Sequence, residues 1–168
     1  PELASIPIKV SVGPTDMPFQ GSYEEFMNLE GSVPIVSVEQ EDSSLVTFTT
    51  GSSGTPKGAN RTHRFLAAQH YGLNECIPYL KEDIDLPVFP VFSLNNLAAG
   101  VTTVIPAIDL GVPKENDPIV LLGQFKATNV TCATLSPSLF NAISAHCIKN
   151  DMTLPNLRRL VTGGAPIS

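Results

Sequence analysis

One short stretch of the chain gathers the residue types whose spacing could do chemistry. It runs from Thr50 to Gly58 and contains three glycines, four hydroxyl residues and one lysine. Glycines let a backbone approach a ligand closely, hydroxyls and main-chain amides donate hydrogen bonds, and Lys57 adds positive charge. Phosphate is the ligand that best uses these features together. The common phosphate-loop pattern differs, because its lysine is followed by Ser or Thr and not by glycine.

Two elements are expected to position this loop. Leu45–Phe48 has the apolar and β-branched content of a buried strand, and Thr62 can cap a helix that runs to about Leu80. The glycine and serine composition alone would favour a mobile surface loop of small residues. The place of the full string between a strand and a helix favours phosphate binding.

The same string resembles the signature loop of the adenylate-forming superfamily, which includes acyl-CoA synthetases, firefly-luciferase-like enzymes and peptide-synthetase adenylation domains. The family pattern is Ser/Thr-Gly-Ser/Thr-Ser/Thr-Gly-x-Pro-Lys-Gly, and this sequence has an allowed residue at every position. The resemblance implies that the ATP phosphates are bound by Thr50, Gly51, Ser52, Ser53, Gly54, Thr55, Pro56, Lys57 and Gly58.

A second segment follows the expected strand at 157–162. Glycines after a strand commonly form only a turn. In the family, however, a Gly-Gly-Ala-Pro segment lies with its backbone against the adenine ring. The resemblance therefore implies an adenine pocket made by Gly163, Gly164, Ala165 and Pro166. Together the two segments indicate ATP and not merely some phosphate.

Three further residues are implied in an acyl or nucleotide pocket. The family often has a Thr-His pair just after its phosphate loop, which His63 matches, and a Pro-Leu-Phe-His segment, which Phe92 and Ser93 match in part. Ser93 replaces the histidine, so a role that needs an imidazole is not expected. No metal site is expected either, because His63 and His70 lack further ligands nearby.

The remaining pattern predicts an α/β fold with a layered, mostly parallel sheet flanked by helices. Strands are predicted at 5–12, 33–38, 84–92, 102–105, 130–135 and 157–162. Helices are predicted at 22–29, 94–101, 117–126 and 136–147, with Ser22, Asp117 and Ser136 as caps. We expect one partial domain, in which residues 1–44 lead into a nucleotide-binding core at 45–168. Ligands of such sheets collect at the carboxyl ends of strands.

Composition excludes some classes of partner. The formal net charge of −6 argues against a nucleic-acid partner. The three cysteines form no CxxC pair and indicate buried, reduced thiols of a cytoplasmic protein. No apolar run reaches the roughly 18 residues that a membrane span needs. The sequence leaves the oligomeric state open, including a homo-oligomer.

The resemblance implies part of an ATP-dependent ligase similar to fatty-acid–CoA ligases, which forms an acyl-adenylate and uses Mg²⁺ and coenzyme A. The family continues with a Tyr-Gly-x-Thr-Glu segment, a ribose-binding Asp and a C-terminal domain that bears a lysine for adenylation. None of these is in the sequence. We therefore expect no catalytic residue within these 168 residues and no activity of this chain alone.

Three alternatives stay open. The sequence of residues 85–118 looks most like that of the β-lactone synthetases of bacterial olefin biosynthesis, which act on β-hydroxy fatty acids. A non-catalytic nucleotide-binding module would keep the loop without the chemistry. A peptide-synthetase adenylation domain would need an acidic residue to bind the amino group of its substrate. The apolar region 86–105 offers no such acid except Asp85 at its start, so an acyl substrate fits better.

Overall fold

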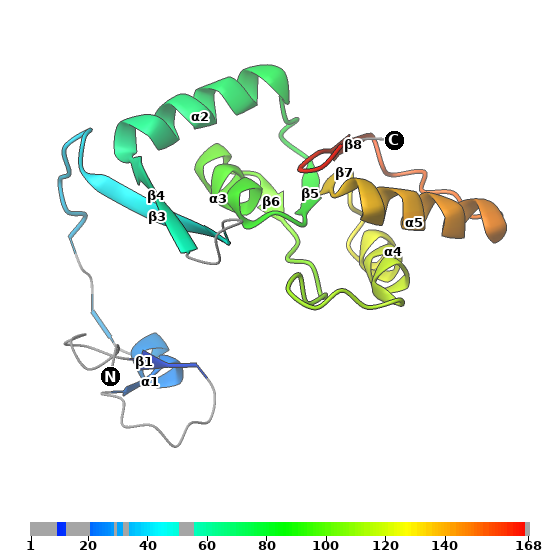
Figure 1. Ribbon diagram of the computed structural model, residues 1–168, viewed down its shortest axis with the longest axis horizontal. Coiled ribbons are helices and arrows are strands. Elements are labelled where there is room, and N and C mark those ends of the chain that lie inside the picture. Colours follow the sequence, from blue (N-terminus) through cyan, green and yellow to red (C-terminus); the bar gives the residue numbers. More distant parts are fainter. Residues whose placement is uncertain (1–9, 13–20, 29, 32–33, 51–55, 167–168) are drawn as a thin grey trace. The chain divides into compact units, whose positions relative to one another are not determined.

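The computed structural model describes residues 10–12, 21–28, 30–31, 34–50 and 56–166. The chain divides into two compact units, Pro1–Glu39 and Gln40–Ser168 (Figure 1). The division expected from the sequence, at residue 44 between a lead-in and a core, stays a prediction.

The first unit contains two short strands and one short helix, β1 (Val10–Ser11), β2 (Gly21–Ser22) and α1 (Tyr23–Met27). The strands pair in parallel. A reciprocal cap starts the helix: the Ser22 amide donates to Glu25 Oε2 at 2.8 Å, and the Glu25 amide donates to Ser22 Oγ at 3.2 Å. The predicted cap is confirmed. The strand predicted at 33–38 is wrong, because residues 34–38 form no strand and are exposed.

The second unit contains, in chain order, β3 (Ser43–Thr50), β4 (Pro56–Thr62), α2 (His63–Cys76), β5 (Ile84–Pro87), α3 (Pro90–Ala99), β6 (Thr102–Thr103), α4 (Asp117–Ala127), β7 (Cys132–Leu135), α5 (Pro137–Lys149) and β8 (Arg159–Thr162). Strands β3 and β4 form an antiparallel hairpin. The other four strands form a parallel sheet in the order β6-β5-β7-β8. The predicted α/β class with a mostly parallel sheet is confirmed.

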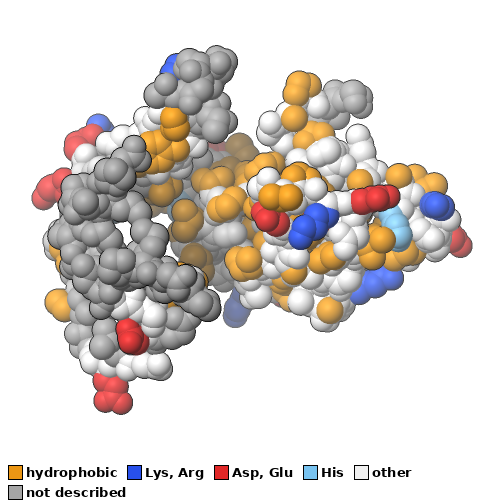
Figure 2. Space-filling view, turned by 60° about the horizontal axis from the view of Figure 1, so that its bottom comes forward, with side chains coloured by type: hydrophobic (Ala, Val, Ile, Leu, Met, Phe, Trp, Pro, Cys, Tyr) orange, Lys and Arg blue, Asp and Glu red, His pale blue; other side chains and the backbone are white. Residues whose placement is uncertain are grey.

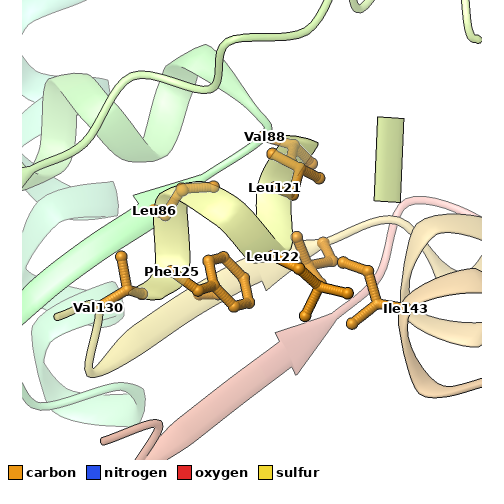
Figure 3. Packing of buried hydrophobic residues seen from close by; sticks show 9 residues of the cluster. Leu86, Val88, Leu121, Leu122, Phe125, Val130 and Ile143 are labelled. Atoms are coloured by element: carbon orange, nitrogen blue, oxygen red, sulfur yellow. The ribbon is translucent and has the colours of Figure 1, made fainter. Parts of the chain in front are cut away.

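The two faces of the sheet differ in chemistry. On one face Leu86 of β5 and Leu135 of β7 pack against α4 and α5, which lie side by side (Figures 1 and 3). The fully buried cluster consists of Leu86, Val88, Leu121, Leu122, Phe125, Val130, Ala133, Leu135 and Ile143. The alternation of side chains along a strand turns Asp85 to the opposite face, where it contacts α3. One face therefore holds the apolar core and the other a polar network.

Several element ends differ from the predictions for local reasons. Helix α2 ends at Cys76 and not near Leu80, because Pro78 cannot continue it. Strand β5 ends at Pro87, and α3 already begins at Pro90, since proline fits the first helical turn. Asp117 does not cap α4: Asn116 precedes the helix, and the Asp117 carboxylate accepts the Lys114 amide instead.

A buried carboxylate fastens the amino ends of the parallel strands. Asp83 is 3% exposed. Its Oδ1 accepts from Thr131 Oγ1 at 2.8 Å, its Oδ2 accepts from the Leu80 amide at 2.7 Å, and Arg158 forms an ion pair with it. Burial alone would raise the pKa of Asp83, but the hydrogen bonds from Leu80, Arg158 and Thr131 outweigh it and lower the pKa to about 2. This carboxylate joins the starts of β5, β7 and β8.

On the face in Figure 2 the basic side chains of the described residues stand apart from one another and form no continuous stripe. No helix among the described residues is both long and apolar enough to cross a bilayer.

Candidate nucleotide-binding site

The glycine-rich string lies in a hairpin and not between a strand and a helix. Thr50 ends β3 and pairs with Pro56, which begins β4, so residues 51–55 make the connection and lie outside the described residues. Lys57 pairs with Thr49 and has an exposed side chain. The predicted helix follows only after β4, where Thr62 Oγ1 accepts the Phe65 amide at 3.2 Å. The predicted cap is confirmed. The sequence did not predict the strand β4, which lies between the loop and the helix.

Glycine at position 58 fits closely within the hairpin. Gly58 pairs with Phe48 across the two strands. A Cβ at Gly58 would stand 3.1 Å from Phe48 Cε1 and 3.3 Å from Val46 Cγ1. Such distances are tighter than most real contacts, so a side chain here would require Phe48, which is 70% exposed, to shift by a few tenths of an ångström. The glycine of the Lys57-Gly58 pair therefore also has a packing role within the hairpin.

The Gly163–Pro166 segment turns directly after β8. The Gly163 amide donates to the Leu135 carbonyl at 3.3 Å, which ties the turn to the carboxyl end of β7. Gly164 has φ +85°, a left-handed conformation that favours glycine. A Cβ there would lie 3.2 Å from Phe89 Cζ. The turn thus presents small residues at the strand ends, where parallel sheets bind ligands.

The three residues implied in an acyl or nucleotide pocket come from two helices. Phe92 and Ser93 lie in the first turn of α3 and are half-buried. The ring of Phe92 is tilted 53° to that of Phe89, with centroids 6.3 Å apart. His63 begins α2, and its amide donates to the Asp42 carbonyl. The structure brings Phe92 close to Phe89, whose ring lies at Gly164, and the ligand roles of His63, Phe92 and Ser93 stay predictions.

A polar network that the sequence did not reveal holds α3 against the sheet. Asp85 Oδ2 accepts from Tyr79 Oη at 2.8 Å and from Asn96 Nδ2 at 2.7 Å. Asp85 and Asn96 are almost completely buried. Arg159 lies over the Tyr79 ring at 4.7 Å. Burial and then the charge of Asp85 raise the pKa of Tyr79, so the phenol keeps its proton well above its ordinary range.

His70 has a structural surrounding, and of the three thiols predicted to be buried, Cys132 is buried, Cys147 is partly exposed and Cys76 is exposed. His70 Nδ1 lies 3.0 Å from Asn95 Oδ1, and its Nε2 lies 3.0 Å from Asn74 Nδ2, so both ring nitrogens are occupied. Burial raises the pKa of the Cys132 thiol. In the described part of the chain no three His, Cys, Asp or Glu side chains are placed to hold a metal ion.

Comparison with known proteins first gives the class. The fold is that of the N-terminal domain of adenylate-forming enzymes. The solved structure of the amide bond synthetase McbA from Marinactinospora thermotolerans matches with a TM-score of 0.74 and 24% identity, covering 99% of this chain and 33% of that one. The family follows from the sequence: residues 5–168 match the model of the AMP-binding enzyme family, and the chain belongs to that family.

Two curated relatives show which proteins this chain is similar to. It is 33% identical over 138 residues to the olefin beta-lactone synthetase of Stenotrophomonas maltophilia, which covers 82% of this chain and 24% of that protein. It is 28% identical over 147 residues to the long-chain-fatty-acid–CoA ligase of Thermus thermophilus, covering 86% and 27%. The chain spans about a quarter of the length of these relatives.

Proposed function

We propose that the full-length protein activates a fatty carboxylate with ATP, which gives an acyl-adenylate and pyrophosphate. One observation carries the proposal: the Thr50–Gly58 string joins β3 to β4 and the Gly163–Pro166 turn follows β8, in one α/β unit of a chain that belongs to the AMP-binding family. The long-chain-fatty-acid–CoA ligase among its relatives supports a fatty acid as the substrate.

In this reaction a carboxylate oxygen attacks the α-phosphorus of ATP. The new bond joins that oxygen to phosphorus, the bond between the α-phosphorus and the bridging oxygen breaks, and pyrophosphate leaves with both electrons. Carboxylate and triphosphate repel each other, so the protein must supply orientation and positive charge. The amides and hydroxyls of Thr50–Gly58 hold the β- and γ-phosphates, and Lys57 offsets their charge. Gly163–Pro166 lets the adenine ring lie close to the backbone.

Other parts of the proposal come from the family. Coenzyme A is the proposed acceptor of the acyl group, and the cytoplasm is the proposed location. Magnesium would accompany ATP, but the described residues do not by themselves make a magnesium site.

The test of the loop uses ATP–pyrophosphate exchange in the full-length protein. Lys57→Ala and the double variant Ser52→Ala/Ser53→Ala should each lower the exchange rate roughly 10- to 100-fold, the worth of a lost charge-assisted contact. Lys81→Ala is the matched control, because Lys81 is also exposed but lies before β5. Exchange at the wild-type rate in both loop variants would refute the assignment.

A second candidate product is a β-lactone. The relative with 33% identity is an olefin beta-lactone synthetase, whereas the fatty-acid–CoA ligase is 28% identical. A panel of fatty and β-hydroxy fatty acids separates the two. Thioester formation that requires coenzyme A supports the ligase, and lactone formation without coenzyme A supports the synthetase.

A module that binds a nucleotide without chemistry remains the contrasting hypothesis. It predicts ATP binding with no exchange for any acid in the panel. Exchange that depends on an added acid would exclude it.

A further inference from the structure

The Gly163–Pro166 turn is supported from the sheet by one hydrogen bond and one side chain. The hydrogen bond runs from the Gly163 amide to the Leu135 carbonyl at the end of β7. The side chain is Phe89, because a Cβ built at Gly164 would lie 3.2 Å from its Cζ and 3.5 Å from its Cε1. Among the described residues, chain neighbours of Gly164 aside, Phe89 alone comes within 4 Å of that position. The ring of Phe89 therefore bounds the turn on this side.

The backbone that carries this ring is fixed on both sides. Before it, the Val88 amide donates to the Thr134 carbonyl at 2.9 Å, which continues the pairing of β5 with β7. After it, the Phe89 carbonyl accepts the Phe92 amide at 3.0 Å in the first turn of α3. Pro90 follows directly and restricts Phe89 to the extended region, where its φ is −102° and its ψ is 119°. The ring thus projects from a rigid junction between a strand and a helix.

Phe89 also lines a cavity of about 520 Å³ at the carboxyl ends of β5 and β7. The lining includes the charged residues Asp109, Lys114, Glu115 and Asp117. Phe89 is half-buried and lies beside the fully buried core cluster, not within it. Shortening its side chain would therefore enlarge an existing open space and leave no sealed void in the core, which is the costly case. Variants at this position are expected to fold.

We propose that Phe89 is a positioning residue for the nucleotide and acts through Gly164. Two consecutive glycines leave a backbone with more conformational freedom than any other pair of residues. The turn therefore needs support from outside to keep the one conformation in which Gly164 has φ +85°. A ring edge held against Gly164 supplies that support, so the turn is already ordered when a base arrives, and binding does not have to order it. The inference rests on the proposed function, in which this turn lies against adenine.

The experiment compares two probes on the full-length protein by calorimetry, magnesium–ATP and magnesium–tripolyphosphate. Tripolyphosphate has the phosphates but no base, so it reports on the phosphate loop and on correct folding without the adenine turn. Phe89→Leu removes the ring edge and keeps an apolar side chain, and Phe89→Ala removes the whole ring. Leu110→Ala is the matched control, because Leu110 lines the same cavity, is 47% exposed and does not come within 4 Å of a Cβ at Gly164.

Both Phe89 variants should bind ATP about 5- to 30-fold more weakly, the cost of fixing the backbone of one more residue on binding. Their affinity for tripolyphosphate should stay at the wild-type value, and Leu110→Ala should bind both probes like the wild type. Unchanged ATP affinity in both Phe89 variants, or an equal loss for both probes, would overturn the positioning role even where exchange confirms adenylation. A selective loss for ATP in a protein that shows no exchange would support the role of Phe89 and contradict the proposed function.

Discussion

Replacing Asp83 by asparagine should destabilise the protein in a way that depends on pH. The folded-state pKa of Asp83 is about 2, against an ordinary value of 3.8. Because the folded pKa is the lower one, the stabilising effect is present above the ordinary pKa and is lost as the pH falls through about 2. At 1.36 kcal/mol per pKa unit, the contribution at pH 7 is about 2 kcal/mol. Water screens the share of Arg158, whose side chain is 39% exposed, so this is an upper figure.

Urea unfolding at pH 7 and at pH 3 measures this effect. Asp83→Asn should lower the free energy of unfolding by about 2 kcal/mol at pH 7 and by clearly less at pH 3, where the unfolded carboxyl is largely protonated. Glu82→Gln is the matched control, because Glu82 is next to Asp83 in the chain but has an exposed side chain. This substitution should change stability little. A loss that is equal at both pH values would refute the reasoning, because it would then come from packing and not from charge.

Three further predictions concern the core, the polar network and the turn. Ile143→Ala should lower the unfolding free energy by about 2–5 kcal/mol, while Ile148→Ala, at an 81% exposed position, should change it by less than about 0.5 kcal/mol in the same urea titration. Tyr79 should keep its proton beyond pH 10, and the stabilisation from its raised pKa should be lost only as the pH rises further. Tyr79→Phe should remove from an ultraviolet pH titration a phenol that ionises above the ordinary tyrosine range. Gly164→Val should raise the KM for ATP more than Gly163→Ala, since Gly164 has φ +85° and a Cβ at Gly163 meets open space; equal effects would contradict a conformational role.

Local signals were predicted well from the sequence. The caps at Ser22, Thr62 and Ser136 depend on residues three apart, and all three are confirmed by side-chain hydrogen bonds. The alternation of strands and helices was enough for the α/β class. Prolines were misread twice: the strand predicted at 84–92 runs through Pro90, which instead starts α3, and the helix predicted to about Leu80 runs through Pro78, although α2 ends at Cys76.

Features that depend on distant partners could not be predicted. Strand β4 contains Gly58 and Asn60, which give no strand pattern, and it exists because it pairs with β3. The contact of Asp85 with Asn96 and the cavity beside Phe89 arise only when separate segments come together. For the loop, the structure gives the two strands that hold its ends, and the phosphate contacts of its residues stay a prediction.

The central claim is that the full-length protein transfers AMP to a fatty carboxylate. The most direct test uses dodecanoate labelled with oxygen-18 in its carboxyl group, with ATP and coenzyme A, and mass analysis of the nucleotide product. Since thiol attack breaks the bond between the acyl carbon and the bridging oxygen, the account predicts AMP that carries one labelled oxygen from the acid. Unlabelled AMP, or ADP in its place, would contradict it.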